Sequence, residues 1–127
     1  MIDAHLNEVR RRMRGDRRLW MTPLHRAEWT HAIVQHVFRG MIPVLQAEGF
    51  YAAFEADRQR GLWLEAEVPE MAFETCAQLA RQYGPRLGVG TLDTLHVASA
   101  LELKASEFWT FDQRQGKLAR AVGLKTS

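Results

Sequence analysis

The chain has 127 residues, and its 17 Lys and Arg residues against 15 Asp and Glu residues leave a formal charge of 17 − 15 = +2. Hydrophobic residues make up 46% and charged residues 25%, which argues against a disordered chain and predicts one soluble domain with a single core. No apolar run approaches the roughly 18 residues of a membrane span. The single cysteine excludes an internal disulfide, and we expect a cytoplasmic protein without a membrane partner.

In chain order, helical patterns alternate with short apolar runs. Thr22 followed by Pro23 predicts a helix start, because threonine caps helices well and proline suits the first helical position. We expect helices at 4–14, 23–38, 43–60 (with a break at Gly49 as an alternative), 70–83, 91–104 and 113–122. Strands are expected at 18–21, 62–68, 108–111 and 124–126, and a loop at 84–90. This alternation predicts a mostly parallel sheet covered by helices, with ligands at the carboxyl ends of its strands.

Two aspartates stand at expected helix starts. Asp112 follows the apolar run FWTF and precedes the last helix, so its carboxylate should lie at the carboxyl end of a strand. It equally fits an N-cap, with Gln115 completing a capping box. Asp93 lies in the first turn of an apolar helix, where the helix dipole favours acids. We expect Asp93 to face a pocket, with ordinary capping as the alternative.

Glu28 lies at the edge of an apolar stripe on the helix at 23–38. The members of this stripe, which we expect to face inward, are Leu24, Ala27, His31, Val34 and Phe38. A carboxylate near a core face needs a partner, so the alternative to a functional role is a glutamate that extends to solvent or forms a salt bridge to Arg26 or Arg86. Three acids near helix starts would repel one another unless divalent cations lay between them, and oxygen ligands favour Mg²⁺ or Mn²⁺ over zinc.

Other groups that could carry chemistry are assigned structural roles. His25 and His31 flank Glu28 but are six residues apart, which does not suit a zinc helix. Cys76 follows an apolar helical pattern and is interpreted as a small buried residue, and His96 as a core histidine. The four tryptophans, which could stack on bases, are interpreted mainly as packing residues: Trp20, Trp29, Trp63 and Trp109.

The stretch TLDTLHVASALELKASEFWTFDQRQGKLARAVGL, at 91–124, resembles the C-terminal half of PIN domains, especially toxin ribonucleases of VapC type. Its first helix matches the family pattern T-L-D-x-L-H-x-A-x-A, its strand ends in T-F-D, and its last helix ends in A-x-x-x-G-L. The earlier stretch LWMTPLHRAEWTHAI is similar to the second strand and acid-bearing helix of the family. The resemblance implies a single PIN-like domain at 1–127 with a three-layer α/β/α sandwich and a mostly parallel sheet.

The resemblance also implies a site and partners. Glu28, Asp93 and Asp112 correspond to three of the four family acids, which hold Mg²⁺ or Mn²⁺, and Thr110 matches a polar position beside the last acid. The implied activity is endonucleolytic cleavage of RNA by the toxin of a toxin–antitoxin pair. An antitoxin protein and a second copy in a homodimer are the expected protein partners.

Arginines crowd the stretch at 10–18, and such a cluster can contact phosphate. Arg10, Arg11 and Arg14 are the candidates for RNA binding, and a solvated helix face is the alternative interpretation. The other members of the cluster are Arg12, Arg17 and Arg18.

The N-terminus departs from the family pattern. PIN domains begin with a central strand of the form apolar-apolar-Asp-Thr/Ser-Ser, whereas the sequence here begins MIDAH, with no Thr or Ser after Asp3. We therefore expect this first strand to be missing, as in a truncated chain, with Asp3 as a candidate replacement for its acid. The missing acid also supports an alternative function, a catalytically silent PIN-like module that binds RNA or a protein.

Overall fold

The computed structural model describes residues 19–105, 107–108, 110 and 112–126 of the chain. The chain forms two compact units, residues 1–67 and residues 68–127, and each is considered by itself. The described part of the first unit contains β1 (Leu19–Met21), α2 (Pro23–Phe38), α3 (Val44–Gln59) and β2 (Trp63–Glu65). The second unit contains α4 (Met71–Leu87), α5 (Thr91–Glu102), β3 (Glu107–Phe108), α6 (Gln113–Ala121) and β4 (Lys125–Thr126).

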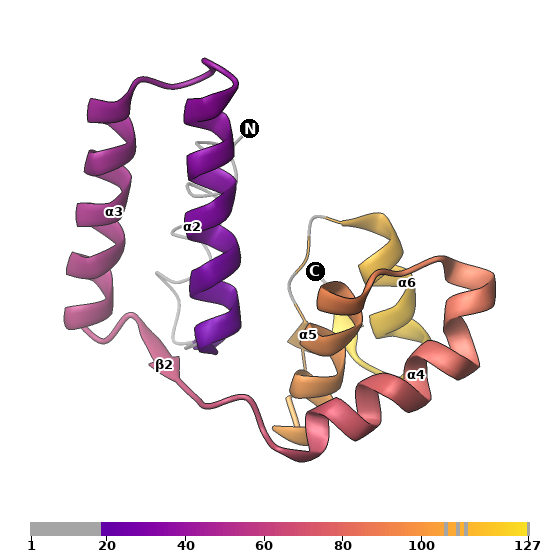
Figure 1. Ribbon diagram of the computed structural model, residues 1–127. Helices are drawn as coiled ribbons and strands as arrows, with labels where there is room; N and C mark the ends of the chain where they lie inside the picture. Colours follow the sequence, from indigo (N-terminus) through magenta and orange to yellow (C-terminus); the bar gives the residue numbers. More distant parts are fainter. Residues whose placement is uncertain (1–18, 106, 109, 111, 127) are drawn as a thin grey trace. The chain divides into compact units, whose positions relative to one another are not determined.

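The first unit consists of two short parallel strands, β1 and β2, and a hairpin of the two helices α2 and α3. β1 pairs with β2 so that Met21 lies opposite Glu65, and the Ala66 N–H donates to the Met21 carbonyl at 2.9 Å. Between these strands, α2 and α3 lie side by side (Figure 1). The carboxyl end of β1 therefore leads directly into α2, the helix that carries Glu28.

The predicted start of α2 is confirmed at Thr22. This residue has an extended backbone (φ −104°, ψ 165°), and Pro23 occupies the first helical position. The Thr22 N–H donates to Nδ1 of His25 at 3.1 Å, so the histidine fills the place of the Glu or Gln of an ordinary capping box. Nδ1 of His25 therefore helps to cap α2, and this agrees with the structural role that the sequence predicts for His25.

The predicted inward face of α2 is wrong. Val34 is 48% exposed and Phe38 89% exposed, whereas Ile33 is fully buried. The face that packs includes Trp29, which stacks on Phe54 of α3 with ring centroids 4.5 Å apart. Trp29 and Ile33 are four residues apart and so share one side of the helix. Apolar residues occur on several sides of α2, and the aromatic residues of α3 select the packed side, which the periodicity of α2 alone does not reveal.

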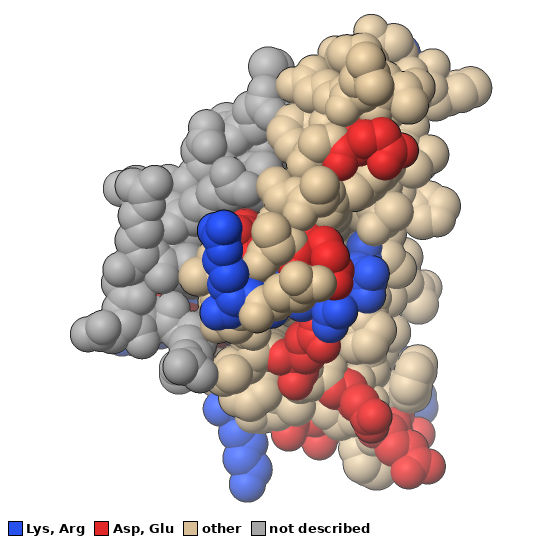
Figure 2. Space-filling model, turned by 90° about the vertical axis from the view of Figure 1, so that its left-hand side faces the viewer, with Lys and Arg blue, Asp and Glu red and all other residues tan. Residues whose placement is uncertain are grey.

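The end of the hairpin exposes a group of large apolar side chains, which we call the hairpin tip. These side chains are 48–89% exposed and come from the last turns of α2, the connecting loop and the first turn of α3: Val34, Phe38, Met41, Val44 and Leu45. Figure 2 views the α3 side, where acidic and basic side chains gather in the middle and the upper end is largely uncharged. An apolar group of this kind is typical of a binding surface.

The second unit is built around α5. Residues 94–99 of this helix are all buried, including the polar Thr94, His96 and Ser99. Buried hydroxyls require partners, and Thr94 and Ser99 donate to carbonyls four residues earlier, at 2.8 Å each. α4 packs against α5, and α6 contacts both (Figure 1). The strands β3 and β4 pair in parallel, with Glu107 opposite Lys125.

Two predicted helix features differ from the structure. α3 continues through Gly49, so the alternative break there does not occur. α4 runs to Leu87, through the residues 84–85 that were expected to form a loop. Proline normally forces its preceding residue out of the helical region through a clash with that residue's Cβ and N–H, and Gly84 has no Cβ. The helix ends at Gly88, whose left-handed φ of 63° suits glycine.

The alternation of helices with parallel strands agrees with the expected α/β class, in a mostly helical form. Both described strand pairs are parallel, and the described strands have two or three residues each, with the one predicted at 62–68 reduced to Trp63–Glu65. The helix expected at 4–14 lies outside the described residues. Among the helices that the structure describes, none is long and apolar enough to cross a membrane.

Candidate functional site

The three candidate acids are divided between the two units. Glu28 is half-buried in α2 of the first unit, and Asp93 and Asp112 stand at the starts of α5 and α6 in the second. Within residues 19–105, 107–108, 110 and 112–126, no group of three or more His, Cys, Asp and Glu side chains is gathered closely enough to hold a metal ion. The expected convergence of Glu28 with the two aspartates therefore stays a prediction.

Asp112 is the N-cap of α6, as the sequence predicts. Its backbone is extended (φ −92°, ψ 124°), and its Oδ1 accepts a hydrogen bond from the Gln115 N–H at 2.8 Å. This bond satisfies one of the amide groups that every helix start leaves without a helical partner. Among the described residues it is the only hydrogen bond to the Asp112 carboxylate, so Oδ2 is available to a cation.

The predicted reciprocal half of this capping box is wrong. The Asp112 N–H donates to the hydroxyl of Thr110 at 3.0 Å rather than to the side chain of Gln115. The Thr110 hydroxyl in turn donates to Oε1 of Gln115 at 2.6 Å. The side chain of Gln115 contacts Thr110 and Asp93 instead, and the Thr110 hydroxyl accepts the hydrogen bond from the Asp112 N–H.

The second end of the Gln115 amide reaches another helix. Nε2 of Gln115 donates to the backbone carbonyl of Asp93, 22 residues earlier in the chain, at 3.2 Å. Gln115 is only 8% exposed, so its side-chain contacts to Thr110 and Asp93 are partly shielded from water, which strengthens them. We call the chain of contacts from Asp112 through Thr110 and Gln115 to Asp93 the Gln115 bridge. It joins the starts of the two helices that carry the candidate aspartates.

The donor chemistry at these two helix starts suits a hard divalent cation. Asp93 is half-buried in the first turn of α5, and Asp112 is exposed. Carboxylate oxygens are the ligands that Mg²⁺ and Mn²⁺ prefer, and two carboxylates with water are an ordinary magnesium environment. Asp93 and Asp112 therefore fit part of such a centre.

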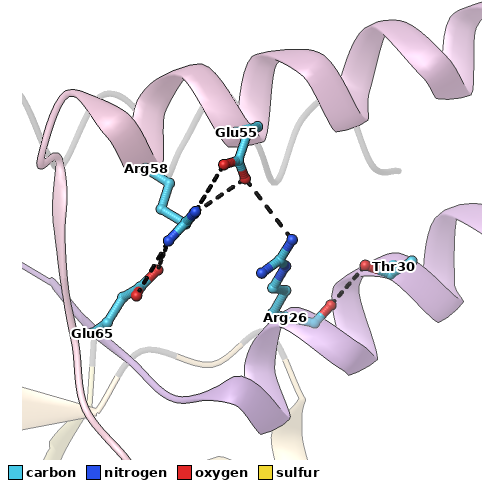
Figure 3. Close-up of polar contacts among 5 residues, drawn as sticks. All are labelled: Arg26, Thr30, Glu55, Arg58 and Glu65. Carbon is cyan, nitrogen blue, oxygen red and sulfur yellow. Dashed lines mark hydrogen bonds and ion pairs between the residues drawn. The ribbon is translucent and has the colours of Figure 1, made fainter.

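The strand ends of the first unit are held by an ion-pair network around Arg58 (Figure 3). Arg58 donates from Nη2 to Oε1 of Glu55 at 2.9 Å and from Nη1 to Oε1 of Glu65, at the carboxyl end of β2, at 3.1 Å. Arg26, in the first turns of α2, lies 3.9 Å from Oε2 of Glu55. The hydrogen bonds from Arg58 hold the pKa of Glu55 below its ordinary value. The network connects α3, β2 and the start of the helix that bears Glu28.

The remaining candidate groups have structural surroundings. His96 is 3% exposed in the middle of α5, which confirms its interpretation as a core residue. Cys76 is half-buried, its thiol lies 3.8 Å from the Thr91 carbonyl, and desolvation raises its pKa, which opposes the reactive thiolate form. Trp29 and Trp63 pack in the first unit as expected, but Trp20 is 55% exposed.

Several predicted residues lie outside the described residues. The residues in this group are Asp3, Trp109 and the candidate RNA-binding arginines Arg10, Arg11 and Arg14. The bridging role of Gln115 and the Arg58 network were not predicted. A glutamine three residues after a capping aspartate was the available signal for Gln115, but that spacing points to the local cap and not to Asp93.

Comparison with known proteins identifies a family. A model of the PIN domain matches residues 3–121, which is nearly the whole chain. No curated protein and no solved structure matches the chain.

Proposed function

Because the chain belongs to the PIN-domain family, whose members are generally nucleases, we propose that it is a metal-dependent endoribonuclease, the toxin of a toxin–antitoxin pair of VapC type. Its substrate is RNA, and the reaction is hydrolysis of a phosphodiester bond. The observation that carries this proposal is the Gln115 bridge, which holds the starts of α5 and α6, each with an aspartate of the family pattern.

In this proposal, Glu28, Asp93 and Asp112 hold Mg²⁺ or Mn²⁺ through their carboxylate oxygens. The bound cation supplies an acidified water and offsets the negative charge that develops during phosphodiester cleavage. The chain itself orients the ligands. The Gln115 N–H engages Oδ1 of Asp112, so Oδ2 is the oxygen that would bind the cation, and Thr110 fixes the backbone of the same residue. The Arg58 network reaches α2 at Arg26, two residues before Glu28, through the ion pair with Glu55.

The same proposal assigns the chain one PIN-like domain with a three-layer α/β/α sandwich and a mostly parallel sheet. The parallel pairing of β1 with β2 and of β3 with β4 supports it. An antitoxin protein is the proposed partner, with a second copy of the chain in a homodimer. The exposed apolar side chains of the hairpin tip support a protein partner, because surfaces of this kind are usually covered in a complex.

The hairpin tip also favours a second candidate function, a non-catalytic PIN-like module that acts by binding a protein or RNA. In that case Asp112 acts only as a helix cap and Asp93 only as a first-turn acid. The two functions differ in their need for a divalent cation, and a cleavage assay with and without the cation separates them.

The test is cleavage of a single-stranded RNA by the purified chain in Mg²⁺, in Mn²⁺ and in EDTA. The Asp93→Asn variant should lose cleavage, and Glu74→Gln is its matched control, because Glu74 is an exposed acid in the first turn of α4. Glu28→Gln should also lose cleavage, with the exposed Glu48→Gln as its control. Cleavage that persists in EDTA, or that survives both site variants, would contradict the proposal.

A further inference from the structure

We propose that Gln115 is a positioning residue that fixes the spacing between Asp93 and Asp112. The inference rests on the proposed function in one respect, which is that the two aspartates share a metal centre. Gln115 itself supplies no ligand to that centre. Its contribution is to hold the two helix starts that carry the ligands.

Gln115 contacts both aspartate residues through separate groups. Its backbone N–H donates to Oδ1 of Asp112 at 2.8 Å, and its side-chain Nε2 donates to the Asp93 carbonyl at 3.2 Å. A carbonyl carbon is bonded directly to its own Cα, so fixing the carbonyl of Asp93 also restricts the direction in which its side chain leaves the backbone. Gln115 thus contacts the carboxylate of Asp112 and the backbone of Asp93, and it restricts both.

The side chain of residue 115 matters for orientation because its two contacts are directed. A net hydrogen bond contributes about 1 kcal/mol to stability, and loss of the amide also leaves the Thr110 hydroxyl and the Asp93 carbonyl without these contacts. The Gln115 amide offers an acceptor to the Thr110 hydroxyl and a donor to the Asp93 carbonyl at the same time. The arrangement therefore selects glutamine for its two directed contacts.

Groups that orient metal ligands affect metal affinity almost as strongly as the ligands do, by about 10- to 100-fold when they are lost. Gln115→Met keeps the length of the side chain and loses both amide contacts. We expect it to raise the dissociation constant for Mn²⁺ by about tenfold or more, measured by electron paramagnetic resonance of the unbound ion. Gln113→Met, the same change at an exposed position two residues earlier in α6, should leave the affinity unchanged.

A double-mutant cycle distinguishes positioning from a merely structural role. If Gln115 acts through the placement of Asp112 and Asp93, Gln115→Met should weaken Mn²⁺ binding by a smaller factor in the Asp112→Asn background than in the unmodified chain, because only Asp93 is then left to be placed. A general loss of structure would lower the affinity by the same factor in both backgrounds. Equal factors, or an equal effect of Gln113→Met, would overturn the inference.

A measurement without metal keeps the inference separate from the proposed function. The amide nitrogen of Thr94 shares its peptide group with the Asp93 carbonyl, so Gln115→Met should shift the Thr94 amide resonance in the full-length chain, and Gln113→Met should not. If that shift occurs but the unmodified chain binds no Mn²⁺, the proposed function fails and the link between the helix starts stands. If Mn²⁺ binds but the Thr94 resonance does not move, the proposed function stands and the role of Gln115 is wrong.

Discussion

Nε2 of Gln115 lies 3.2 Å from the carbonyl oxygen of Asp93, and this hydrogen bond joins the starts of α5 and α6 across 22 residues of sequence. Oε1 of the same glutamine accepts a hydrogen bond from the Thr110 hydroxyl at 2.6 Å. The Thr110 hydroxyl in turn accepts a hydrogen bond from the Asp112 N–H. A buried amide with both ends engaged has little freedom to turn, because each rotation would leave a polar group without a partner. The two acidic helix starts are therefore coupled through one side chain.

Thr110→Val should destabilise the fold. The substitution keeps the shape of the side chain but removes the hydroxyl, so Oε1 of Gln115 and the Asp112 N–H both lose their partner. Leaving the buried Gln115 acceptor without this partner costs about 1–3 kcal/mol, which should lower the free energy of unfolding measured with urea, whereas the exposed Asp112 N–H can donate to water.

Thr30→Val is the control for this change. The Thr30 hydroxyl donates to the Arg26 carbonyl at 2.8 Å on an exposed part of α2, where water can replace the lost contact. The expected change is below about 0.5 kcal/mol. Similar losses for the two variants would mean that the Gln115 bridge has no special part in stability.

Removal of Arg58 should change the acid stability of the first unit. Hydrogen bonds from Arg58 hold the pKa of Glu55 below its ordinary value, so this glutamate contributes stability above the ordinary pKa, and the contribution is lost as the pH falls through the lowered pKa. In Arg58→Gln, the pKa of Glu55 should rise toward its ordinary value, as measured by NMR titration of its side-chain carboxyl carbon. Arg60→Gln, at the exposed end of α3, should leave the titration of Glu55 unchanged.

Features set by neighbouring residues were predicted well from the sequence. The start of α2 at Thr22 and Pro23 and the cap of α6 at Asp112 follow from side-chain groups that bond within three or four residues. The end of α4 was missed because Pro85 and the glycines around it favour a loop in most sequences. The structure shows that the glycine directly before the proline allows the helix to continue.

Features set by distant residues could not be predicted. The packed face of α2 depends on Phe54 of α3, and the partner of the Gln115 side chain is 22 residues away. Neither contact leaves a periodic signal in the sequence. For the candidate site, the sequence supplied Asp93, Asp112 and Thr110, and the structure added the residue that connects them.

Cys76 should react slowly with alkylating reagents at neutral pH. Desolvation raises the pKa of its thiol, so the reactive thiolate is scarcer in the folded chain than in a free cysteine. Because the pKa is raised on folding, the thiol contributes stability below its ordinary pKa, and this contribution is lost as the pH rises through the raised value. The rate of iodoacetamide modification against pH should give an apparent pKa above that of the urea-unfolded chain. Coinciding pH profiles would contradict the burial of this thiol.

Asp112→Asn separates the two roles of Asp112. Asparagine caps helices about as well as aspartate, so the free energy of unfolding should change by less than about 1 kcal/mol. The substitution removes the negative charge that a cation requires, so Mn²⁺ affinity and RNA cleavage should both collapse. Glu70→Gln is the matched control, because Glu70 occupies the N-cap position of α4, is exposed and makes no capping hydrogen bond. An Asp112→Asn variant that keeps the stability, the metal affinity and the cleavage rate of the unmodified chain would confine Asp112 to its role as a helix cap.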